Sequence, residues 1–251
     1  SPMLPLLHID GAVATITLRR PRVANKLTPE DLPELIRHVA TVNQTPGVLV
    51  LVRPSEGKHF CSGYDIGQVA QSQNKGSAFG EMVDALEDCR AVTIAAIQGG
   101  VYGGATDMAL ACDFRVGTSA AEMFIPAARL GLHFYQSGLE RYVSRLGLDM
   151  AKRLFLCAEK LDARAMHTCG YLTHLVEGPD PAEAVRALVQ TLAAMAPIAL
   201  LGMKKHLNQI ARGRADAESI AREVQRSAAS QDLREGSLAW QEKRAPVFQG
   251  C

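Results

Sequence analysis

Two apolar, β-branched runs near the start of the chain predict a pair of strands. Leu6 to Ile9 and Ala12 to Leu18 are separated by Asp10-Gly11, a pair that tolerates positive φ and closes a two-residue hairpin. Further along, Val48 to Val52 is apolar throughout, and Val92 to Ile97 is nearly so. Continuous runs of this length are typical of strands buried on both faces of a parallel sheet.

Apolar residues elsewhere recur every three or four positions, which predicts helices. One helix is expected to begin at Thr28-Pro29-Glu30-Asp31, where Thr28 suits the N-cap and Pro29 the first helical position. A short helix is expected from Asp162 to Cys169, capped by Asp162. From Ser137 onward the pattern is almost entirely helical, and its first apolar stripe comprises Leu139, Tyr142, Val143 and Leu146. We therefore predict a β/α core over residues 1–195 and a helical region over 196–251.

Composition and charge restrict the function classes. The chain has 251 residues, enough for one large domain with at most a small appendage. Its 27 Lys and Arg against 26 Asp and Glu give a net charge of +1, so no protein-wide field attracts nucleic acid or an anionic membrane. The six cysteines form no CxxC pair, which favours reduced thiols in a cytoplasmic protein over disulfides or a metal site.

Two loops carry the candidate chemistry, and each has a structural alternative. His59 to Ile66 follows the strand at Val48 to Val52, and α/β proteins bind ligands at the carboxyl ends of parallel strands. Gln98 to Met108 is rich in glycine and runs into a helix predicted from Gly104 to Cys112, whose first N–H groups favour a negative oxygen. The alternatives are an ordinary turn at Gly63 and close packing of a helix on the sheet.

Five segments, spread over nearly the whole chain, match the ordered motifs of one protein family. They are Arg20-Pro21 with Asn25 to Thr28, His59 to Ile66, Ile97 to Asp107, Ala111 to Arg115, and Glu235 to Gly250. Through them the chain resembles the crotonase superfamily, which comprises the enoyl-CoA hydratases and isomerases. The resemblance implies an α/β fold with a crotonase-like ββα spiral core and an α-helical C-terminal trimerisation region.

The resemblance also implies an acyl-CoA thioester substrate and assigns residues to it. The thioester carbonyl oxygen would lie between the backbone N–H groups of Tyr64 and Gly104, each worth about 3–4 kcal/mol to an enolate. Coenzyme A would lie against Arg22, Val23, Ala24, Ser62, Asp65 and Ile66. Because coenzyme A is part of the substrate, we expect no metal and no redox cofactor.

Two positions depart from the family pattern in ways that concern the reaction. Asp107 stands where the family usually has one catalytic glutamate, and Ala127 stands where it has the second. Hydration in the family uses both carboxylates to move protons, and alanine cannot transfer one. Standard two-carboxylate hydration is therefore not expected. Asp107 remains a candidate catalytic residue, although an acidic side chain in a first helical turn also complements the helix dipole.

The segment from Gly131 to Gly138 replaces the small, glycine-rich turn of ordinary hydratases with bulky and ionisable residues. Together with Ala127, its residues Leu132 and His133 are expected to shape the acyl pocket. Tyr135 is a candidate proton donor, and His133 a weaker one, because other branches of the family carry a reactive side chain in this segment. In the alternative interpretation both rings only fill space under the acyl chain.

Three functions fit these residues. The first is an enoyl-CoA hydratase or isomerase of fatty acid metabolism that stabilises a thioester enolate. The second is decarboxylation of a malonyl-type substrate such as methylmalonyl-CoA, because loss of CO₂ yields the enolate without a carboxylate base. The third is a coenzyme A-binding homologue without turnover. RNA binding, known in one branch, gains no support from the net charge of +1, and the resemblance implies assembly as a homotrimer or hexamer.

Overall fold

The strands form two sheets. The computed structural model describes residues 3–64 and 75–251. Its strands are β1 (Leu6–Asp10), β2 (Val13–Thr17), β3 (Val50–Arg53), β4 (Val92–Ile97), β5 (Gly100–Tyr102), β6 (Phe114–Thr118), β7 (Glu122–Phe124), β8 (Leu161–Asp162) and β9 (His174–Val176). Within the described residues the larger sheet has the order β1-β2-β3-β4-β6-β9 and the smaller one the order β5-β7-β8. In the larger sheet β1 and β2 pair antiparallel, and every later neighbour is parallel.

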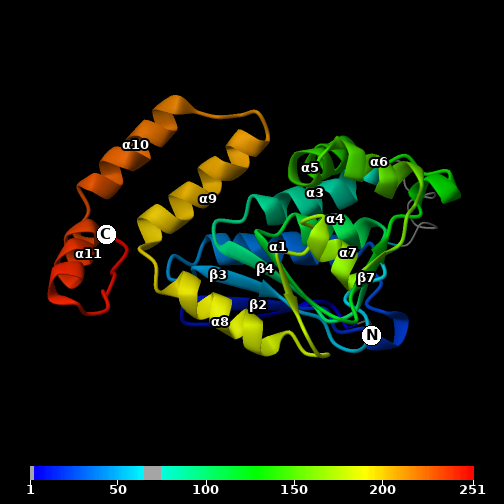
Figure 1. Cartoon of the computed structure of the whole chain (residues 1–251), viewed down its shortest axis with the longest axis horizontal. Helices are drawn as coiled ribbons and strands as arrows, with labels where there is room; N and C mark the ends of the chain where they lie inside the picture. The colour runs from blue at the N-terminus through cyan, green and yellow to red at the C-terminus, as the bar shows by residue number, and fades with distance from the viewer. Residues whose placement is uncertain (1–2, 65–74) are drawn as a thin grey trace.

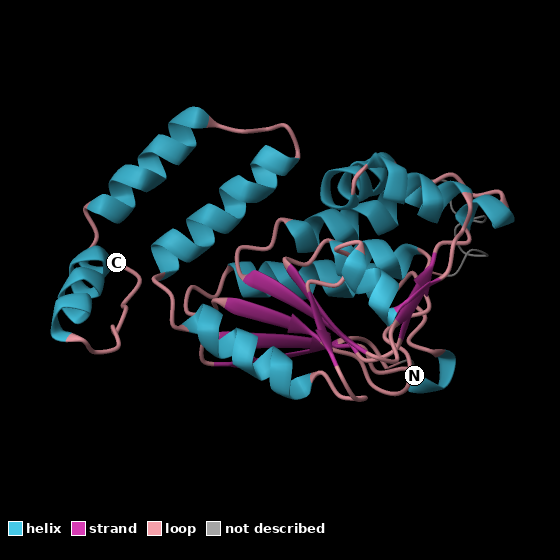
Figure 2. Ribbon diagram, in the orientation of Figure 1, coloured by secondary structure: helices cyan, strands magenta, loops and turns pink. Residues whose placement is uncertain are grey.

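Helices cover both faces of the larger sheet, as Figures 1 and 2 show. The helices of the described residues are α1 (Asp31–Asn43), α3 (Lys75–Glu87), α4 (Gly104–Leu110), α5 (Gln136–Leu146), α6 (Leu148–Leu156), α7 (Ala163–Thr168), α8 (Ala182–Ala193), α9 (Pro197–Ala211), α10 (Ala217–Ala228) and α11 (Gln231–Glu242), with short 3-10 helices at Pro21–Val23 and Ala127–Leu130. Successive side chains of a strand point to opposite faces. Leu51 therefore joins the core cluster of α1 and α3, and Val50 and Val52 join the cluster of α8.

Most of the predicted elements are present, and several boundaries differ: β3 is Val50–Arg53 instead of Val48 to Val52, and α4 ends at Leu110 instead of Cys112. The structure confirms that β3 and β4 are buried along their whole length, and that the Asp162 side chain caps α7 by accepting the Ala165 N–H at 2.9 Å. The hairpin turn lies at 11–12, one residue later than predicted, because Asp10 pairs with Val13. Helix α1 begins at Asp31 rather than at Thr28, because residues 28–31 form a separate turn in which the Asp31 N–H donates to the Thr28 carbonyl at 3.0 Å and the Asp31 carboxylate accepts the Thr28 N–H at 2.8 Å.

The C-terminal helices extend away from the larger sheet (Figure 1). Helix α9 is tied to the body by buried Lys204, whose Nζ lies 2.9 Å from Oδ2 of Asp113. The domain boundary predicted between residues 195 and 196 falls in the connection from α8 to α9 and stays a prediction. Among the described residues no single helix is long and apolar enough to cross a membrane, and α8 with α9 meets that criterion only as a pair bent by 110°.

Candidate active site

The backbone around Gly63 lies directly against the start of α4. The Tyr102 N–H donates to the Cys61 carbonyl at 3.1 Å, which aligns the two glycine-containing loops. Gly63 has a φ of +108°, and a Cβ on it would lie 2.9 Å from the Tyr102 carbonyl oxygen and 3.7 Å from the Gly104 nitrogen. The peptide that carries the Tyr64 N–H therefore lies beside the first turn of α4, and this contact leaves no room for a side chain.

The segment predicted to hold coenzyme A borders the same loop. The Ser62 N–H donates to the Ala24 carbonyl at 2.9 Å, and Ala24 adopts the left-handed conformation with a φ of 52°. Arg22 and Val23 are exposed in the short 3-10 helix that precedes it. Contacts of these residues with coenzyme A stay predictions. Two further residues predicted for this role lie outside the described part of the chain, namely Asp65 and Ile66.

Asp107 is fully buried in α4, and both of its carboxylate oxygens are engaged. Arg141 donates from Nε to Oδ1 at 2.7 Å and from Nη2 to Oδ2 at 2.8 Å. The Tyr135 hydroxyl donates to Oδ2 as well. The structure thus brings together Asp107 and Tyr135, two residues predicted from separate segments, and adds an arginine that the sequence analysis did not consider.

Aromatic packing and the buried carboxylate both fix Tyr135. Its ring stacks on Phe134 with centroids 4.5 Å apart and meets Phe79 edge-on at 6.0 Å. Gly80 allows the close approach, since a Cβ there would lie 3.1 Å from the ring. Burial raises the pKa of Tyr135 well above 10.0, and the charge and hydrogen bond of Asp107 raise it further. The phenol therefore keeps its proton at neutral and mildly alkaline pH.

Phe79 forms a wall beside the Gly104 amide. A Cβ on Gly104 would lie 2.9 Å from the Phe79 ring, and that ring stacks on Tyr64 with centroids 5.5 Å apart. The space next to the first turn of α4 is thus bounded by two aromatic rings. Phe79 was not predicted as a site residue, because an apolar side chain in a helix gives no chemical signal of a site in the sequence.

The remaining residues predicted for the acyl pocket differ in exposure. Ala127 is buried, and its carbonyl accepts the Leu132 N–H at 2.9 Å. Leu132 is half-buried and packs against the main core cluster. His133 is exposed, and its Nδ1 lies 2.7 Å from the Phe134 carbonyl oxygen. No contact between His133 and Asp107 is found in the described part of the structure, and both roles of His133 stay predictions.

Helix α5 turns a charged side chain inward. Arg141 is 1% exposed, whereas Val143 of the predicted apolar stripe is 44% exposed. The prediction that Val143 lies on the buried face is therefore wrong. The ion pairs of Arg141 with Asp107 and Glu87 hold the face of α5 that carries Arg141 against the core. No signal in the sequence indicated this, because apolar spacing assigns arginine to the solvent side.

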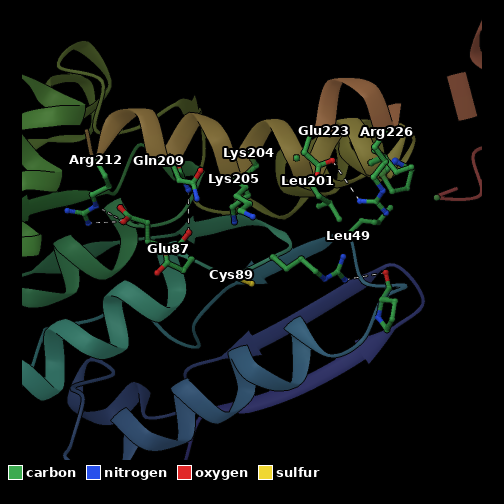
Figure 3. Close-up of a pocket in the computed structure, with 18 of the residues that line it drawn as sticks. Leu49, Glu87, Cys89, Leu201, Lys204, Lys205, Gln209, Arg212, Glu223 and Arg226 are labelled. Carbon is green, nitrogen blue, oxygen red and sulfur yellow. Dashed lines mark hydrogen bonds and ion pairs between the residues drawn. The ribbon is translucent and has the colours of Figure 1, made fainter. Parts of the chain in front are cut away.

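A cavity of about 1060 Å³ lies elsewhere, between α9, α10 and the segments leading into β3 and β4 (Figure 3). Charged side chains such as Lys204, Arg212 and Glu223 line it, and the predicted catalytic residues do not. Glu87 faces this cavity and also pairs with Arg141. In the part of the chain that the structure describes, no group of three or more His, Cys, Asp or Glu residues could hold a metal ion.

Comparisons with known proteins agree with this architecture. The family model described as enoyl-CoA hydratase/isomerase matches residues 8–251. The human mitochondrial enoyl-CoA hydratase domain-containing protein 2 is 31% identical over 258 residues, covering 96% of this chain and 87% of that protein. The crotonyl-CoA hydratase of Syntrophomonas wolfei is 27% identical over 257 residues, covering 97% and 96%.

Solved structures give the same result for the fold. The structure of DspI from Pseudomonas aeruginosa is similar with a TM-score of 0.89 at 31% identity, covering 98% of this chain and 96% of that one. An enoyl-CoA hydratase structure from Geobacillus kaustophilus has a TM-score of 0.89 at 27% identity, covering 99% of both chains. The predicted crotonase-like α/β fold with a helical C-terminal region is thereby confirmed. By its sequence over nearly its whole length, and by its fold, this chain belongs to the enoyl-CoA hydratase/isomerase family.

Proposed function

We propose that this protein acts on an acyl-CoA thioester and stabilises the enolate form of its acyl group. The observation that carries the proposal is the contact of the Gly63 backbone with the start of α4, 3.7 Å from a Gly63 Cβ to the Gly104 nitrogen. In the proposal the Tyr64 N–H and the Gly104 N–H donate to one thioester oxygen, and this contact of the preceding residue with Gly104 supports that pairing. Two such donors in a site closed off by aromatic rings strongly favour a developing oxyanion.

Hydration or isomerisation of an enoyl-CoA is the first candidate reaction, since it is the activity after which the family is named. Ala127 removes one of the two carboxylates that carry protons in such a reaction. We assign the transfer at the α-carbon to Tyr135. In hydration its O–H bond breaks as the Cα–H bond forms, and the phenolate then takes the proton released by the water whose oxygen bonds to the β-carbon.

Decarboxylation of a malonyl-type thioester is the second candidate, and one observation favours it. Both oxygens of Asp107 are engaged by Arg141 and Tyr135, and Ala127 has no acidic group. Loss of CO₂ needs no carboxylate base, because the electron pair of the breaking C–C bond forms the enolate. The enolate then takes its proton from Tyr135 as above.

The first test is to incubate the protein with crotonyl-, 3-enoyl-, methylmalonyl- and long-chain enoyl-CoA and to follow each by mass spectrometry. We expect conversion of the short thioesters and little of the long one, because the Phe79 ring occupies the space beside Gly104. A hydrated or isomerised product supports the first candidate, and loss of CO₂ the second. Binding of coenzyme A without turnover identifies a non-catalytic homologue. If the protein neither binds coenzyme A nor converts any thioester, the proposal is contradicted.

We also propose that the protein assembles as a homotrimer or hexamer. The support is a set of large apolar side chains left exposed on the C-terminal helices, including Met203 at 61%, Leu207 at 65% and Trp240 at 86%. Large apolar side chains left exposed along helices are typical of surfaces that another chain covers. Sedimentation is expected to give three or six times the mass of one chain, and a stable monomer would contradict the assembly.

The proposal includes no separate cofactor and no metal, because backbone N–H groups and one phenol supply the required donors. Coenzyme A enters only as part of the substrate. A nucleic acid or membrane partner is not part of the proposal either, and a cytoplasmic location stays a prediction.

A further inference from the structure

Arg141 is the centre of a buried charge network behind the candidate active site. Besides its two hydrogen bonds to Asp107, its Nη1 donates to Oε1 of Glu87 at 2.8 Å, and its Nη2 lies 3.4 Å from Oδ1 of Asp84. Burial by itself lowers the pKa of Arg141, but the hydrogen bonds and charges of Asp107 and Glu87 outweigh it, so the pKa is raised. Arg141 is therefore a fixed cation with a set orientation.

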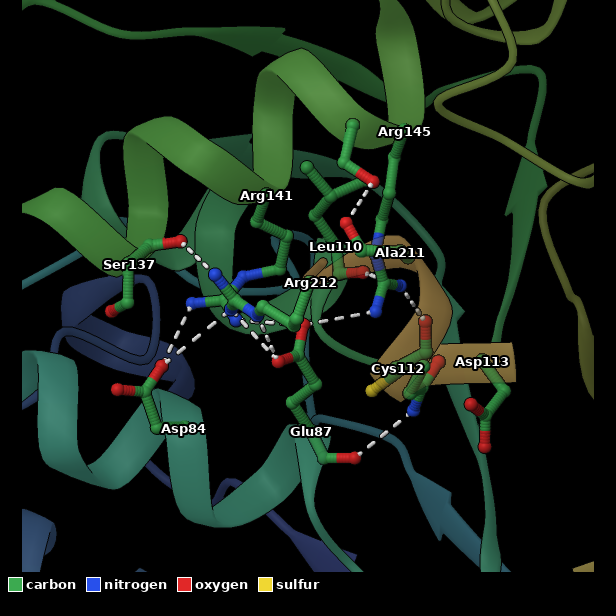
Figure 4. A network of polar contacts seen from close by, with 12 residues as sticks. Asp84, Glu87, Leu110, Cys112, Asp113, Ser137, Arg141, Arg145, Ala211 and Arg212 are labelled. Atoms are coloured by element: carbon green, nitrogen blue, oxygen red, sulfur yellow. Dashed lines mark hydrogen bonds and ion pairs between the residues drawn. The ribbon is translucent and has the colours of Figure 1, made fainter. Parts of the chain in front are cut away.

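A second group of contacts holds Arg141 in turn (Figure 4). Glu87 also accepts from Arg145 at 3.1 Å and from Nε of Arg212 at 2.8 Å. Arg212, at the end of α9, donates to the Ser137 carbonyl at 3.0 Å. Ser137 lies in the first turn of α5, two residues after Tyr135. The network thus joins the C-terminal helix α9 to the two helices that carry Glu87 and Arg141.

Of the contacts described above, only those of Asp107 connect the charge network to the candidate active site. Asp107 lies three residues after Gly104 in α4, and its Oδ2 accepts from both Arg141 and the Tyr135 hydroxyl. An Asp107 carboxylate held at two points by a planar guanidinium cannot rotate without breaking both bonds. The direction of the Tyr135 hydroxyl is therefore set by the arginine.

We propose that Arg141 and Asp107 are positioning residues, which act on the acyl group only by fixing the hydroxyl of Tyr135. Glu87 and Arg212 support them from the second group of contacts. This inference rests on the proposed function, because it takes Tyr135 as the group that transfers the proton. It departs from the expectation, drawn from the family pattern, that Asp107 itself is catalytic.

A double-mutant cycle separates these roles. With crotonyl-CoA and methylmalonyl-CoA as substrates, Tyr135→Phe is expected to lower kcat about 100-fold or more, and Asp107→Asn about 10- to 100-fold. In the Tyr135→Phe background, Asp107→Asn is expected to change kcat by less than about 3-fold, because its effect passes through the missing hydroxyl. An Asp107→Asn loss of the same size in both backgrounds would overturn the proposal and make Asp107 a direct participant.

Arg141→Lys tests the arginine while keeping its charge. A lysine cannot donate to both oxygens of Asp107 in one plane, so we expect kcat to fall about 10- to 100-fold with KM changed by less than about 3-fold. The matched control is Arg153→Lys in α6, which makes the same change in an exposed pair with Glu159, where Nε donates to Oε2 at 2.9 Å. Equal kcat in Arg141→Lys and Arg153→Lys would contradict the proposal.

A measurement that needs no turnover distinguishes the positioning role of Arg141 and Asp107 from the proposed function. Protein labelled with ¹³Cζ-tyrosine gives a signal for Tyr135 that Tyr135→Phe identifies. Because the Tyr135 hydroxyl donates to Oδ2 of Asp107, the ¹³Cζ chemical shift of Tyr135 at pH 7 is expected to differ from that of the wild type in both Asp107→Asn and Arg141→Lys. Unchanged chemical shifts in both variants overturn the positioning role. If the wild type converts no thioester but the chemical shifts change, the proposed function fails and the structural link between Asp107 and Tyr135 stands.

Discussion

Replacing Gly63 by alanine is expected to lower kcat about 100- to 1000-fold, the loss typical of removing one oxyanion donor. The φ of +108° at Gly63 disfavours any L side chain, at a cost of about 1–2 kcal/mol. The new methyl group would also lie 2.9 Å from the Tyr102 carbonyl oxygen, which is part of the backbone and cannot move aside easily. The peptide carrying the Tyr64 N–H must therefore shift away from Gly104, and the two N–H groups no longer converge.

The measurement is kcat and KM on the thioesters that the wild type converts, with circular dichroism to verify folding. Gly178→Ala is the matched control, because Gly178 has a φ of +91° and a Cβ there would meet nothing within 4 Å. It shares the backbone strain of Gly63→Ala without the contact at the site, and we expect nearly wild-type kcat. Similar kcat losses in Gly63→Ala and Gly178→Ala would show that strain alone matters and would remove the support for the two-donor site.

Arg141→Met is expected to lower the free energy of unfolding by about 3–5 kcal/mol, the usual result of removing one partner from a buried ion pair. Methionine fills a similar volume, so a cavity is not the main cause. The cause is electrostatic, because Asp107 is fully buried and Glu87 is 6% exposed, and both lose a charged hydrogen-bond donor. Urea denaturation monitored by circular dichroism at pH 7 measures the change.

The pH dependence of this loss identifies its electrostatic origin. Burial raises the pKa of Glu87, and the charges and hydrogen bond of Arg141, Arg145 and Arg212 lower it by more, so it lies below 4.5. A lowered carboxyl pKa stabilises the fold above that ordinary value, and this contribution is lost as the pH falls through the folded pKa. We therefore expect the Arg141→Met deficit to be largest near neutral pH and to shrink below about pH 4.5.

Arg153→Met is the control for this stability measurement, since its pair with Glu159 is exposed and the midpoint of denaturation should barely move. A deficit in Arg141→Met that is independent of pH between 3 and 7 would indicate lost packing instead of unpaired charge.

Local patterns in the sequence determined much of the fold. β3 and β4 follow from continuous apolar runs, and α7 from a cap at Asp162, because these signals involve residues within a few positions of one another. The five ordered motifs led to the family, which the comparisons confirm. The short strands β5, β7 and β8 were not predicted, since two or three residues carry no periodicity and their pairing is entirely tertiary.

For the candidate site, the sequence by itself determined the glycine-rich loops, Asp107, the missing carboxylate at Ala127, and Tyr135. Only the tertiary structure decided that Asp107 pairs with Arg141, 34 positions away, and accepts a hydrogen bond from the Tyr135 hydroxyl. The physical reason is the free-energy cost of burying a charge, because a buried arginine or aspartate is stable only beside an oppositely charged, hydrogen-bonded partner. The residues next to Asp107 and Arg141 in the sequence do not identify the partner of either one, so the pair can be recognised only in the folded structure.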